Sequence, residues 1–112
     1  MKNFDVIVIW SGSWGLTVAI WLASAWKKVA LVEKWAIGWD CTNTWCVPSK
    51  AFIDLAKSWV YKDLKSVLEK VRERRESIRE EETKEKLEEY WIKFIKWFAS
   101  FLDKTTLEID WK

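Results

Sequence analysis

The first 34 residues contain two short apolar runs, separated by a longer stretch crowded with small and apolar side chains. Residues 4–9, FDVIVI, are nearly all apolar and rich in β-branched side chains, which predicts a strand buried on both faces. Residues 28–34, KVALVEK, predict a second buried strand that ends in an acid. The stretch between them suits a helix packed closely on a sheet, because apolar side chains crowd it at Leu16, Val18, Ala19, Ile20, Leu22 and Ala23. This order predicts a β-α-β unit with a right-handed crossover and ligands at the carboxyl ends of its strands.

Residues 61–90 have a different pattern, in which a narrow apolar stripe runs through many charges. The stripe recurs at helical spacing, at Leu64, Val67, Leu68, Val71 and Ile78. Glu80–Lys84 and Glu82–Lys86 are spaced as i,i+4 ion pairs on the solvent face of a helix. Residues 62–90 hold nine basic and ten acidic side chains, so the segment is nearly neutral. We therefore expect a solvated helix or helical hairpin between strands rather than an arm that binds nucleic acid.

The last 22 residues, 91–112, contain three short apolar runs. IKFI is expected to complete the parallel sheet, and FASFL and TLEI to form a meander. The chain is thus predicted to be an α/β protein with a charged helical insertion at 62–90 and short strands over 91–112.

The turn after the first strand reads WSGSWG over residues 10–15. The dinucleotide fingerprint of a Rossmann-like unit is G-x-G-x-x-G, with an acid about 20 residues later for the ribose. Gly12 and Gly15 occupy the second and third glycine positions, Trp10 occupies the first, and Glu33 fits the acid. A tight strand-to-helix turn without a ligand is the alternative interpretation.

Two cysteines five residues apart, Cys41 and Cys46, are followed by Pro48, Ser49 and Lys50. This spacing indicates thiol chemistry beside a bound ligand, and in a reducing compartment two cysteines are more often catalytic or metal-binding than a structural staple. They could instead be buried small hydrophobic residues. A structural zinc site requires four Cys or His ligands, whereas the chain has two Cys and no His.

Composition limits the remaining function classes. With 112 residues the chain is one small domain or a piece of a larger one. Its net charge of +2 gives no electrostatic footprint for nucleic acid. The amino terminus lacks the pattern of a signal peptide, and the apolar runs are too short to span a membrane, so we expect a cytoplasmic protein.

Residues 4 to about 57 resemble the amino terminus of the flavin-dependent pyridine nucleotide-disulfide oxidoreductases, in particular the mercuric reductase and dihydrolipoamide dehydrogenase group. The motifs that carry the resemblance are the turn at 10–15, Glu33, and the redox segment. The family pattern of the redox segment is G-G-[TD]-C-x-N-x-G-C-x-P-S-K, and the corresponding sequence in this chain is GWDCTNTWCVPSK over 38–50. The resemblance implies a Rossmann-like FAD-binding fold.

The resemblance also implies roles for individual residues. The FAD pyrophosphate would lie over the turn from Gly12 to Gly15, and Glu33 would accept from the adenosine ribose. Cys41 would be the thiol that exchanges with substrate, and Cys46 would lie against the flavin. Lys50 would place its ammonium near the flavin ring. The remaining candidate cofactor-binding residues are Ser11, Ser13, Lys34, Gly38 and Asp40. No metal site in the protein itself is expected.

In the whole family, electrons pass from NAD(P)H through FAD to a disulfide, here Cys41–Cys46, and on to a disulfide or mercuric substrate. Full-length members are expected to be homodimers that act on small-molecule or metal-thiolate substrates, with no nucleic-acid or membrane partner. Family members also have a nicotinamide-binding domain and an interface domain that this chain lacks, so we expect residues 1–112 alone to be inactive. A ligand-free, tryptophan-rich module for interaction with another surface is the alternative function.

Tryptophan and glycine occur in inverted proportions, with eleven Trp and three Gly. Trp10, Trp39 and Trp45 stand where the family has glycine, and Trp14 where it often has one. Six more stand at turn-like places: Trp26, Trp35, Trp59, Trp91, Trp97 and Trp111. Only Trp21 is expected to be an ordinary helical tryptophan. We interpret this as near-systematic replacement of glycine by tryptophan, through engineering, altered codon reading or a fault in the recorded sequence, and expect it to be costly to the fold.

Overall fold

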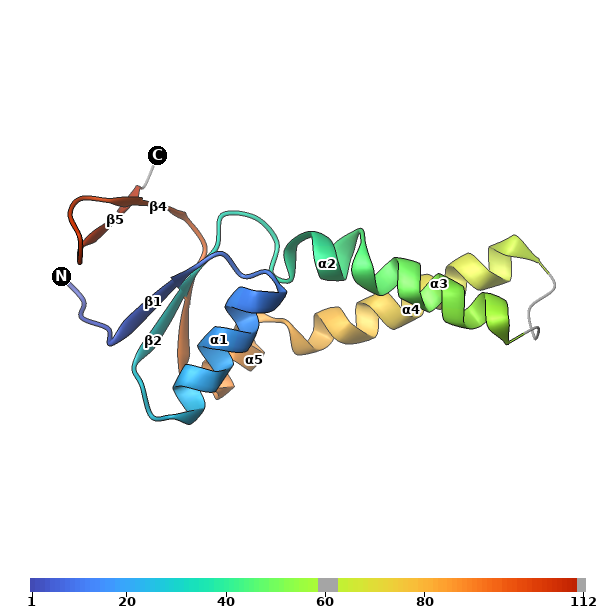
Figure 1. The fold of residues 1–112 in the computed structure, drawn as a ribbon, viewed down its shortest axis with the longest axis horizontal. Coiled ribbons are helices and arrows are strands. Elements are labelled where there is room, and N and C mark those ends of the chain that lie inside the picture. The colour runs from blue at the N-terminus through green and yellow to red at the C-terminus, as the bar shows by residue number, and fades with distance from the viewer. Residues whose placement is uncertain (59–62, 111–112) are drawn as a thin grey trace.

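A three-stranded parallel sheet joins the first 32 residues of the protein to a strand near its carboxyl terminus (Figure 1). The structure is a computed structural model that describes residues 1–58 and 63–110. Strands β1 (Val6–Ile9), β2 (Val29–Val32) and β3 (Ile92–Ile95) lie in the order β1-β2-β3. Val29 pairs with Val6 on one side and with Ile92 on the other. The predicted α/β class and its parallel sheet are confirmed. The prediction that the first strand is buried on both faces is wrong, because β1 lies at the edge of the sheet, where its residues are half-buried and Ile9 is exposed.

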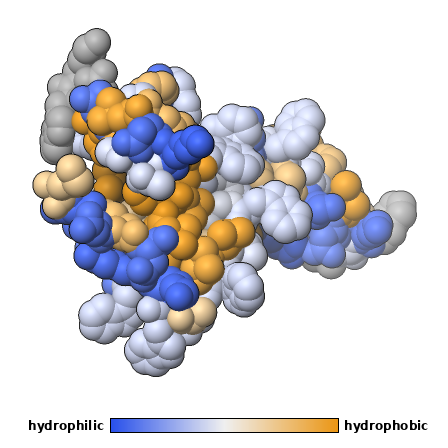
Figure 2. All heavy atoms as spheres, turned by 60° about the vertical axis from the view of Figure 1, so that its left-hand side comes forward, coloured by the Kyte–Doolittle hydropathy of each residue, from blue (hydrophilic) through white to orange (hydrophobic). Residues whose placement is uncertain are grey.

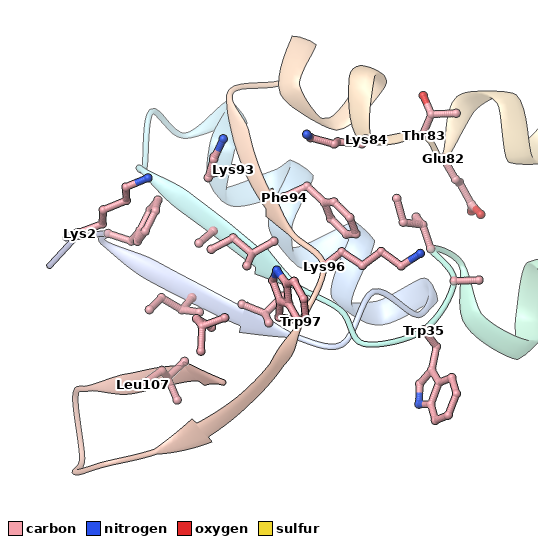
Figure 3. A pocket seen from close by; sticks show the side chains of 18 of the residues that line it. Lys2, Trp35, Glu82, Thr83, Lys84, Lys93, Phe94, Lys96, Trp97 and Leu107 are labelled. Atoms are coloured by element: carbon pink, nitrogen blue, oxygen red, sulfur yellow. The ribbon is translucent and has the colours of Figure 1, made fainter. Parts of the chain in front are cut away.

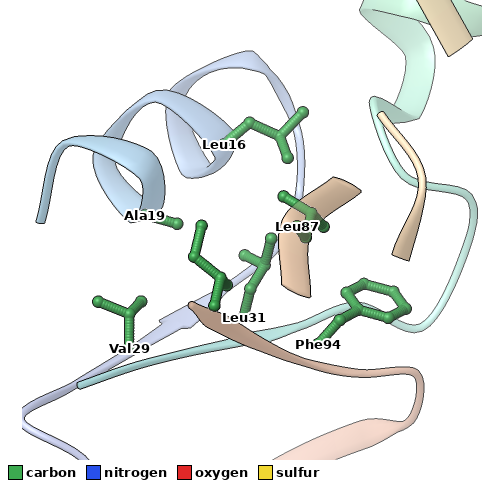
Figure 4. Close-up of a cluster of buried hydrophobic side chains, with 7 residues drawn as sticks. Leu16, Ala19, Val29, Leu31, Leu87 and Phe94 are labelled. Carbon is green, nitrogen blue, oxygen red and sulfur yellow. The ribbon is translucent and has the colours of Figure 1, made fainter. Parts of the chain in front are cut away.

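One face of this sheet carries the main hydrophobic core (Figure 4). Helix α1 (Ser13–Ser24) packs on the sheet through Leu16 and Ala19, and the small Ala19 side chain is completely buried. Helix α5 (Lys84–Glu89) adds Leu87, which is 2% exposed. The apolar run of β2 is buried at every position, as its lack of alternation predicted.

Three helices extend away from the sheet as an arm (Figure 1). They are α2 (Trp39–Asn43), α3 (Cys46–Lys57) and α4 (Leu64–Glu81). Helices α3 and α4 pack against each other through a second, smaller core of Ala51, Leu55, Val67 and Val71. The arm explains why the radius of gyration is 17.2 Å, when a compact chain of this length has about 13 Å.

The charged segment differs from its prediction in one respect. Helix α4 ends at Glu81 and α5 begins at Lys84, so Glu80–Lys84 and Glu82–Lys86 do not lie on one helix. Lys84 pairs with Glu88, and Lys86 pairs with Glu89. The predicted solvent-face pairs are therefore wrong, because Thr83 caps a new helix by accepting a hydrogen bond from the Lys86 backbone N–H.

An antiparallel hairpin lies beyond the other face of the parallel sheet, formed by β4 (Phe98–Phe101) and β5 (Leu107–Asp110). Between them is an apolar cavity of about 1380 Å³, lined by residues that include Ile7, Val32, Ile95 and Leu107. Figure 3 shows Lys2 and Lys93 toward one end of it and Glu82 toward the other. Figure 2 shows hydrophobic surface bordered by hydrophilic side chains on this side of the molecule. The cavity includes neither cysteine nor the turn after β1.

Four tryptophans adopt the left-handed backbone conformation that favours glycine. They are Trp10 (φ 88°), Trp26 (φ 61°), Trp39 (φ 47°) and Trp91 (φ 65°). Across residues 1–58 and 63–110, no other non-glycine residue has a positive φ. Trp14, Trp35, Trp45 and Trp97 have ordinary φ, Trp21 lies inside α1 as expected, and Trp59 and Trp111 lie outside the described residues. The backbone thus supports a glycine-type position at four of the eight sites that lie within the described residues.

Trp26→Gly and Trp91→Gly are each expected to raise the free energy of unfolding by about 1 kcal/mol, because a Cβ in this conformation costs about 1–2 kcal/mol. Both residues directly follow a helix cap and are 94% and 87% exposed, so little packing is lost. Trp21→Gly is the matched control: it removes a 70%-exposed indole inside α1 and should lower stability by about 1 kcal/mol. Urea unfolding measures all three, and equal signs at all three sites would contradict this assignment.

No helix within the described residues combines the length and apolar content needed to cross a bilayer.

Candidate functional site

The turn between β1 and α1 is built on close backbone contacts. Trp10 leaves β1 with its N–H bonded to the Val32 carbonyl at 2.8 Å, and Gly12 caps α1 with extended backbone. A Cβ at Gly15 would collide with the Trp10 carbonyl oxygen. Gly15 therefore lets α1 approach the end of β1, which is the packing role of the third glycine of the fingerprint. The first backbone N–H groups of α1 point out of the helix at this turn.

Glu33, at the end of β2, is 3% exposed and holds the turn in place. Its Oε2 accepts hydrogen bonds from the Ser11 backbone N–H and from the Ser11 hydroxyl, both at 2.8 Å. Its Oε1 accepts from the Trp35 backbone N–H at 2.7 Å. The carboxylate thus stabilises the chain's own turn, and its contact with a ribose stays a prediction.

The redox segment begins at Gly38, which has a φ of 82° and caps α2. The Gly38 backbone N–H donates to the Ser11 carbonyl at 2.9 Å, so one hydrogen bond joins the redox segment to the turn after β1. Cys41 lies in α2, and Cys46 is the first residue of α3. Pro48 is tolerated in α3 because it falls in the first turn, where its missing N–H would have no partner.

A cavity of about 510 Å³ joins the two segments. Six of the residues that the sequence predicted as site residues line it: Gly12, Ser13, Gly38, Asp40, Cys41 and Cys46. The rest of its lining is Trp10, Trp39, Thr44 and Trp45. Parts of the chain about 30 positions apart in sequence therefore share one site.

The other predicted site residues lie outside this lining. Ser11, Gly15 and Glu33 are buried and belong to the turn described above. Lys34 lies with its Nζ 5.0 Å from the ring centroid of Trp35 and 5.2 Å from that of Phe98. Lys50 is exposed on α3, one turn beyond Cys46.

The two thiols are free and half-buried, and they interact with each other. The pKa of Cys41 is raised, first because its side chain forms a hydrogen bond with Cys46, and then because burial disfavours the thiolate. Negative charge at Cys46 and Glu82 raises it further, whereas a hydrogen bond with the Ser13 side chain lowers it. The pKa of Cys41 therefore depends on the other cysteine, on the first turn of α1 and on Glu82.

The backbone of the turn fits a dinucleotide phosphate, but the Trp10 side chain does not. A Cβ added to Gly12 would collide with the six-membered ring of Trp10, so the indole covers the glycine where a phosphate would approach. The Trp10 ring meets the Trp39 ring edge to face, with centroids 5.4 Å apart and planes at 84°. Trp10 and Trp39, which both have a left-handed backbone conformation, thus occupy one side of the cavity.

Sequence reasoning missed Glu82. The prediction placed it on the solvent face, whereas its Oε1 accepts a hydrogen bond from the Thr42 hydroxyl at 3.1 Å, and Thr42 is 4% exposed. Burial raises the pKa of Glu82, and the Thr42 hydrogen bond only partly opposes this. The sequence feature that could have indicated this is Thr83, a helix-capping residue type within the charged run. It marks the start of a new helix, and this break places Glu82 toward the protein interior. Within the described part of the chain, no group of three or more Cys, Asp or Glu side chains is placed to hold a metal ion.

No protein-family profile matches the chain. Mercuric reductase from Lysinibacillus sphaericus is 28% identical over 96% of this chain. Dihydrolipoyl dehydrogenase from Acholeplasma laidlawii is 41% identical over 50% of it. Among solved structures, the copper(II) complex of the HOCl-induced flavoprotein disulfide reductase RclA from Escherichia coli is 26% identical over 92% of this chain, with a TM-score of 0.75.

The matched part is a minority of each relative. The chain spans 22% of the length of the mercuric reductase, 17% of the dihydrolipoyl dehydrogenase and 24% of the RclA chain. These similarities confirm the resemblance expected from the sequence: the chain is similar to one part of the mercuric reductases, the dihydrolipoyl dehydrogenases and the flavoprotein disulfide reductase RclA.

Proposed function

We propose that the cavity between the turn after β1 and the redox segment is the dinucleotide and dithiol site of a flavin-dependent disulfide oxidoreductase, of which this chain forms a part. The observation that carries the proposal is that one cavity is lined by Gly12, Cys41 and Cys46 together. The alternative, a strand-to-helix turn that binds no ligand, does not explain why two thiols line the same cavity as this turn. The fold and sequence similarity to flavoprotein disulfide reductases supports the same function.

The FAD phosphates would lie against the backbone of this turn once the Trp10 ring, which covers Gly12, is displaced or replaced. The N–H groups at the start of α1 would bind its phosphates, because they lack partners within the helix and lie at the positive end of the helix dipole. Glu33 already accepts three hydrogen bonds from Ser11 and Trp35, and its Oε1 would have one acceptor site left for a ribose hydroxyl. When bound, FAD supplies two-electron chemistry that can reduce a disulfide.

The two cysteines would carry the electrons as a reversible disulfide. Reduction of the Cys41–Cys46 bond consumes two electrons and two protons and yields two thiols. Cys41 would exchange with substrate and Cys46 would face the cofactor. Lys50 follows Cys46 by four residues in α3, so both lie on one face of the helix, and the ammonium would lie near the flavin ring.

The path of electrons from NAD(P)H to a disulfide or mercuric substrate belongs to the same proposal, as does the inactivity of residues 1–112 alone. The chain contains no histidine, so a histidine that donates a proton to the exchange thiol would have to come from elsewhere. Homodimers and a cytoplasmic location are likewise proposed for the full-length protein.

Mild oxidation is expected to form an intramolecular Cys41–Cys46 disulfide in nearly every molecule, because the two thiols interact electrostatically and line one cavity. Alkylation of the oxidised protein followed by peptide mass spectrometry measures it. Cys41→Ser and Cys46→Ser are the controls, and each should leave one freely alkylated thiol. Two alkylated thiols after oxidation of the unmodified chain would favour buried, inert cysteines instead.

A further inference from the structure

We propose that Glu82 is a positioning residue of the dithiol site, which ties the redox segment to the junction of α4 and α5 and controls the reactivity of Cys41. The inference rests on the proposed function only for the statement that Cys41 is the exchanging thiol. It assigns Glu82, which lies 41 positions beyond Cys41 in the sequence, to the same site.

The backbone around Glu82 is fixed on both sides. Its own N–H donates to the Arg79 carbonyl at 3.1 Å, which ends α4, and the next residue, Thr83, caps α5. Figure 3 shows Glu82 beside Thr83 at this junction, with its side chain extended away from the backbone. A carboxyl on a backbone held by hydrogen bonds on both sides can position the groups that it contacts.

What it contacts is the start of the redox segment. Its Oε1 accepts from the buried Thr42 hydroxyl, which lies next to Cys41 in α2. Its Oε2 is buried, has no hydrogen-bond partner within the described residues, and lies against Gly38, where a Cβ would collide with it. The exchange thiol Cys41 lies in α2, which begins after Gly38 and includes Thr42. Glu82 therefore contacts α2 at Thr42 and at its capping residue Gly38, and can fix the position of this helix.

Glu82 also acts on Cys41 through its charge. Burial raises the pKa of Glu82, so the carboxyl stays protonated to a higher pH than an exposed glutamate. Once ionised, it opposes the formation of a second negative charge on Cys41, whose pKa it raises. The ionisation of Glu82 at the helix junction therefore lowers the fraction of Cys41 that is present as thiolate.

Other charged groups near this junction are already paired or face solvent. Arg79 pairs with Glu76, Lys84 pairs with Glu88, and Lys96 is exposed. The ionisable groups that act on Cys41 are Cys46 and Glu82, with Ser13 as a neutral hydrogen-bond partner. Glu82 itself is shifted by its burial and by Thr42.

The test is the pH dependence of Cys41 alkylation in the reduced chain, with each cysteine followed by peptide mass spectrometry. Glu82→Gln keeps an oxygen acceptor for Thr42 but cannot ionise, so Cys41 should react about twofold or more faster than in the unmodified chain at pH 8. The difference should shrink as pH falls, because the protonated glutamate and the glutamine are both neutral. Glu81→Gln, which removes an exposed neighbouring charge, should leave the profile unchanged.

Thr42→Val provides a second variant if Glu82→Gln loses its helical circular dichroism. Thr42→Val removes the hydrogen bond that lowers the pKa of Glu82, so Glu82 should ionise only at a higher pH. Cys41 should therefore again react faster than in the unmodified chain, but over a narrower pH range. An unchanged Cys41 profile in a folded variant would overturn the proposal, as would an equal acceleration at every pH, which indicates only a loosened helix. Alkylation requires neither FAD nor a disulfide, so the proposed function can fail in its own tests without obscuring this result.

Discussion

The chain is expected to purify colourless, and replacing Trp10, Trp14, Trp39 and Trp45 together by glycine is expected to let it take up FAD. The ring of Trp10 covers Gly12, and Trp10 and Trp39 lie edge to face beside the cavity. A phosphate must approach the backbone of this turn closely, and an indole at the first glycine position prevents it. Trp10 and Trp39 also hold positive φ values, so glycine should relieve strain of about 1–2 kcal/mol at each.

The measurement is the FAD content of the purified protein, from its visible absorbance, together with an FAD titration. The matched control carries glycine at four tryptophans that do not line the cavity: Trp21, Trp26, Trp35 and Trp91. It should stay colourless although it loses as many indoles. Stoichiometric FAD on the unmodified chain, or equal uptake by the control, would show that the tryptophans do not block the site.

Gly15→Ala is expected to have the largest effect on stability, lowering the free energy of unfolding by about 1–3 kcal/mol or more. Its new Cβ would collide with the Trp10 carbonyl oxygen. This oxygen cannot move freely, because the Trp10 N–H is bonded to Val32 in the neighbouring strand. Helix α1 must therefore shift away from β1, which opens the main core at Leu16 and Ala19.

Gly12→Ala in a Trp10→Gly background is the control for this change. The nearest atoms to a Cβ at Gly12 belong to the Trp10 ring, which that background removes, and the φ of Gly12 is an ordinary −69°. Urea unfolding should show a loss well below that of Gly15→Ala. Equal losses at both positions would mean that the close approach of α1 to β1 is not the reason for the third glycine.

The sequence predicted those parts of the fold that depend on local pattern. The apolar runs at 4–9 and 28–34 form β1 and β2. Only β2, in the centre of the sheet, is buried at every position, whereas β1 lies at the edge and is half-buried, with Ile9 exposed. The hydrogen bond between Gly38 and Ser11 could not be predicted, because no local pattern records which loops meet at the edge of a sheet. Their meeting was expected only through the family resemblance.

Glu82 shows why the site was harder to predict than the fold. In the sequence it is one of three consecutive glutamates, and its neighbours face solvent. Its burial depends on the break between α4 and α5, which turns one carboxyl of the run toward Thr42. The tryptophans show the reverse case, since a comparison of motifs located glycine-type positions at Trp10 and Trp39, and both hold a left-handed backbone.

The central claim is that the turn after β1 and the redox segment form one site. The most direct test is alkylation of Cys41 and Cys46 in the four-glycine variant, with and without saturating FAD. Both thiols line the cavity that contains Gly12, so bound FAD should slow the alkylation of Cys46 severalfold, and that of Cys41 less. FAD that binds to the variant while both thiols react at unchanged rates would place the cofactor elsewhere and contradict the account.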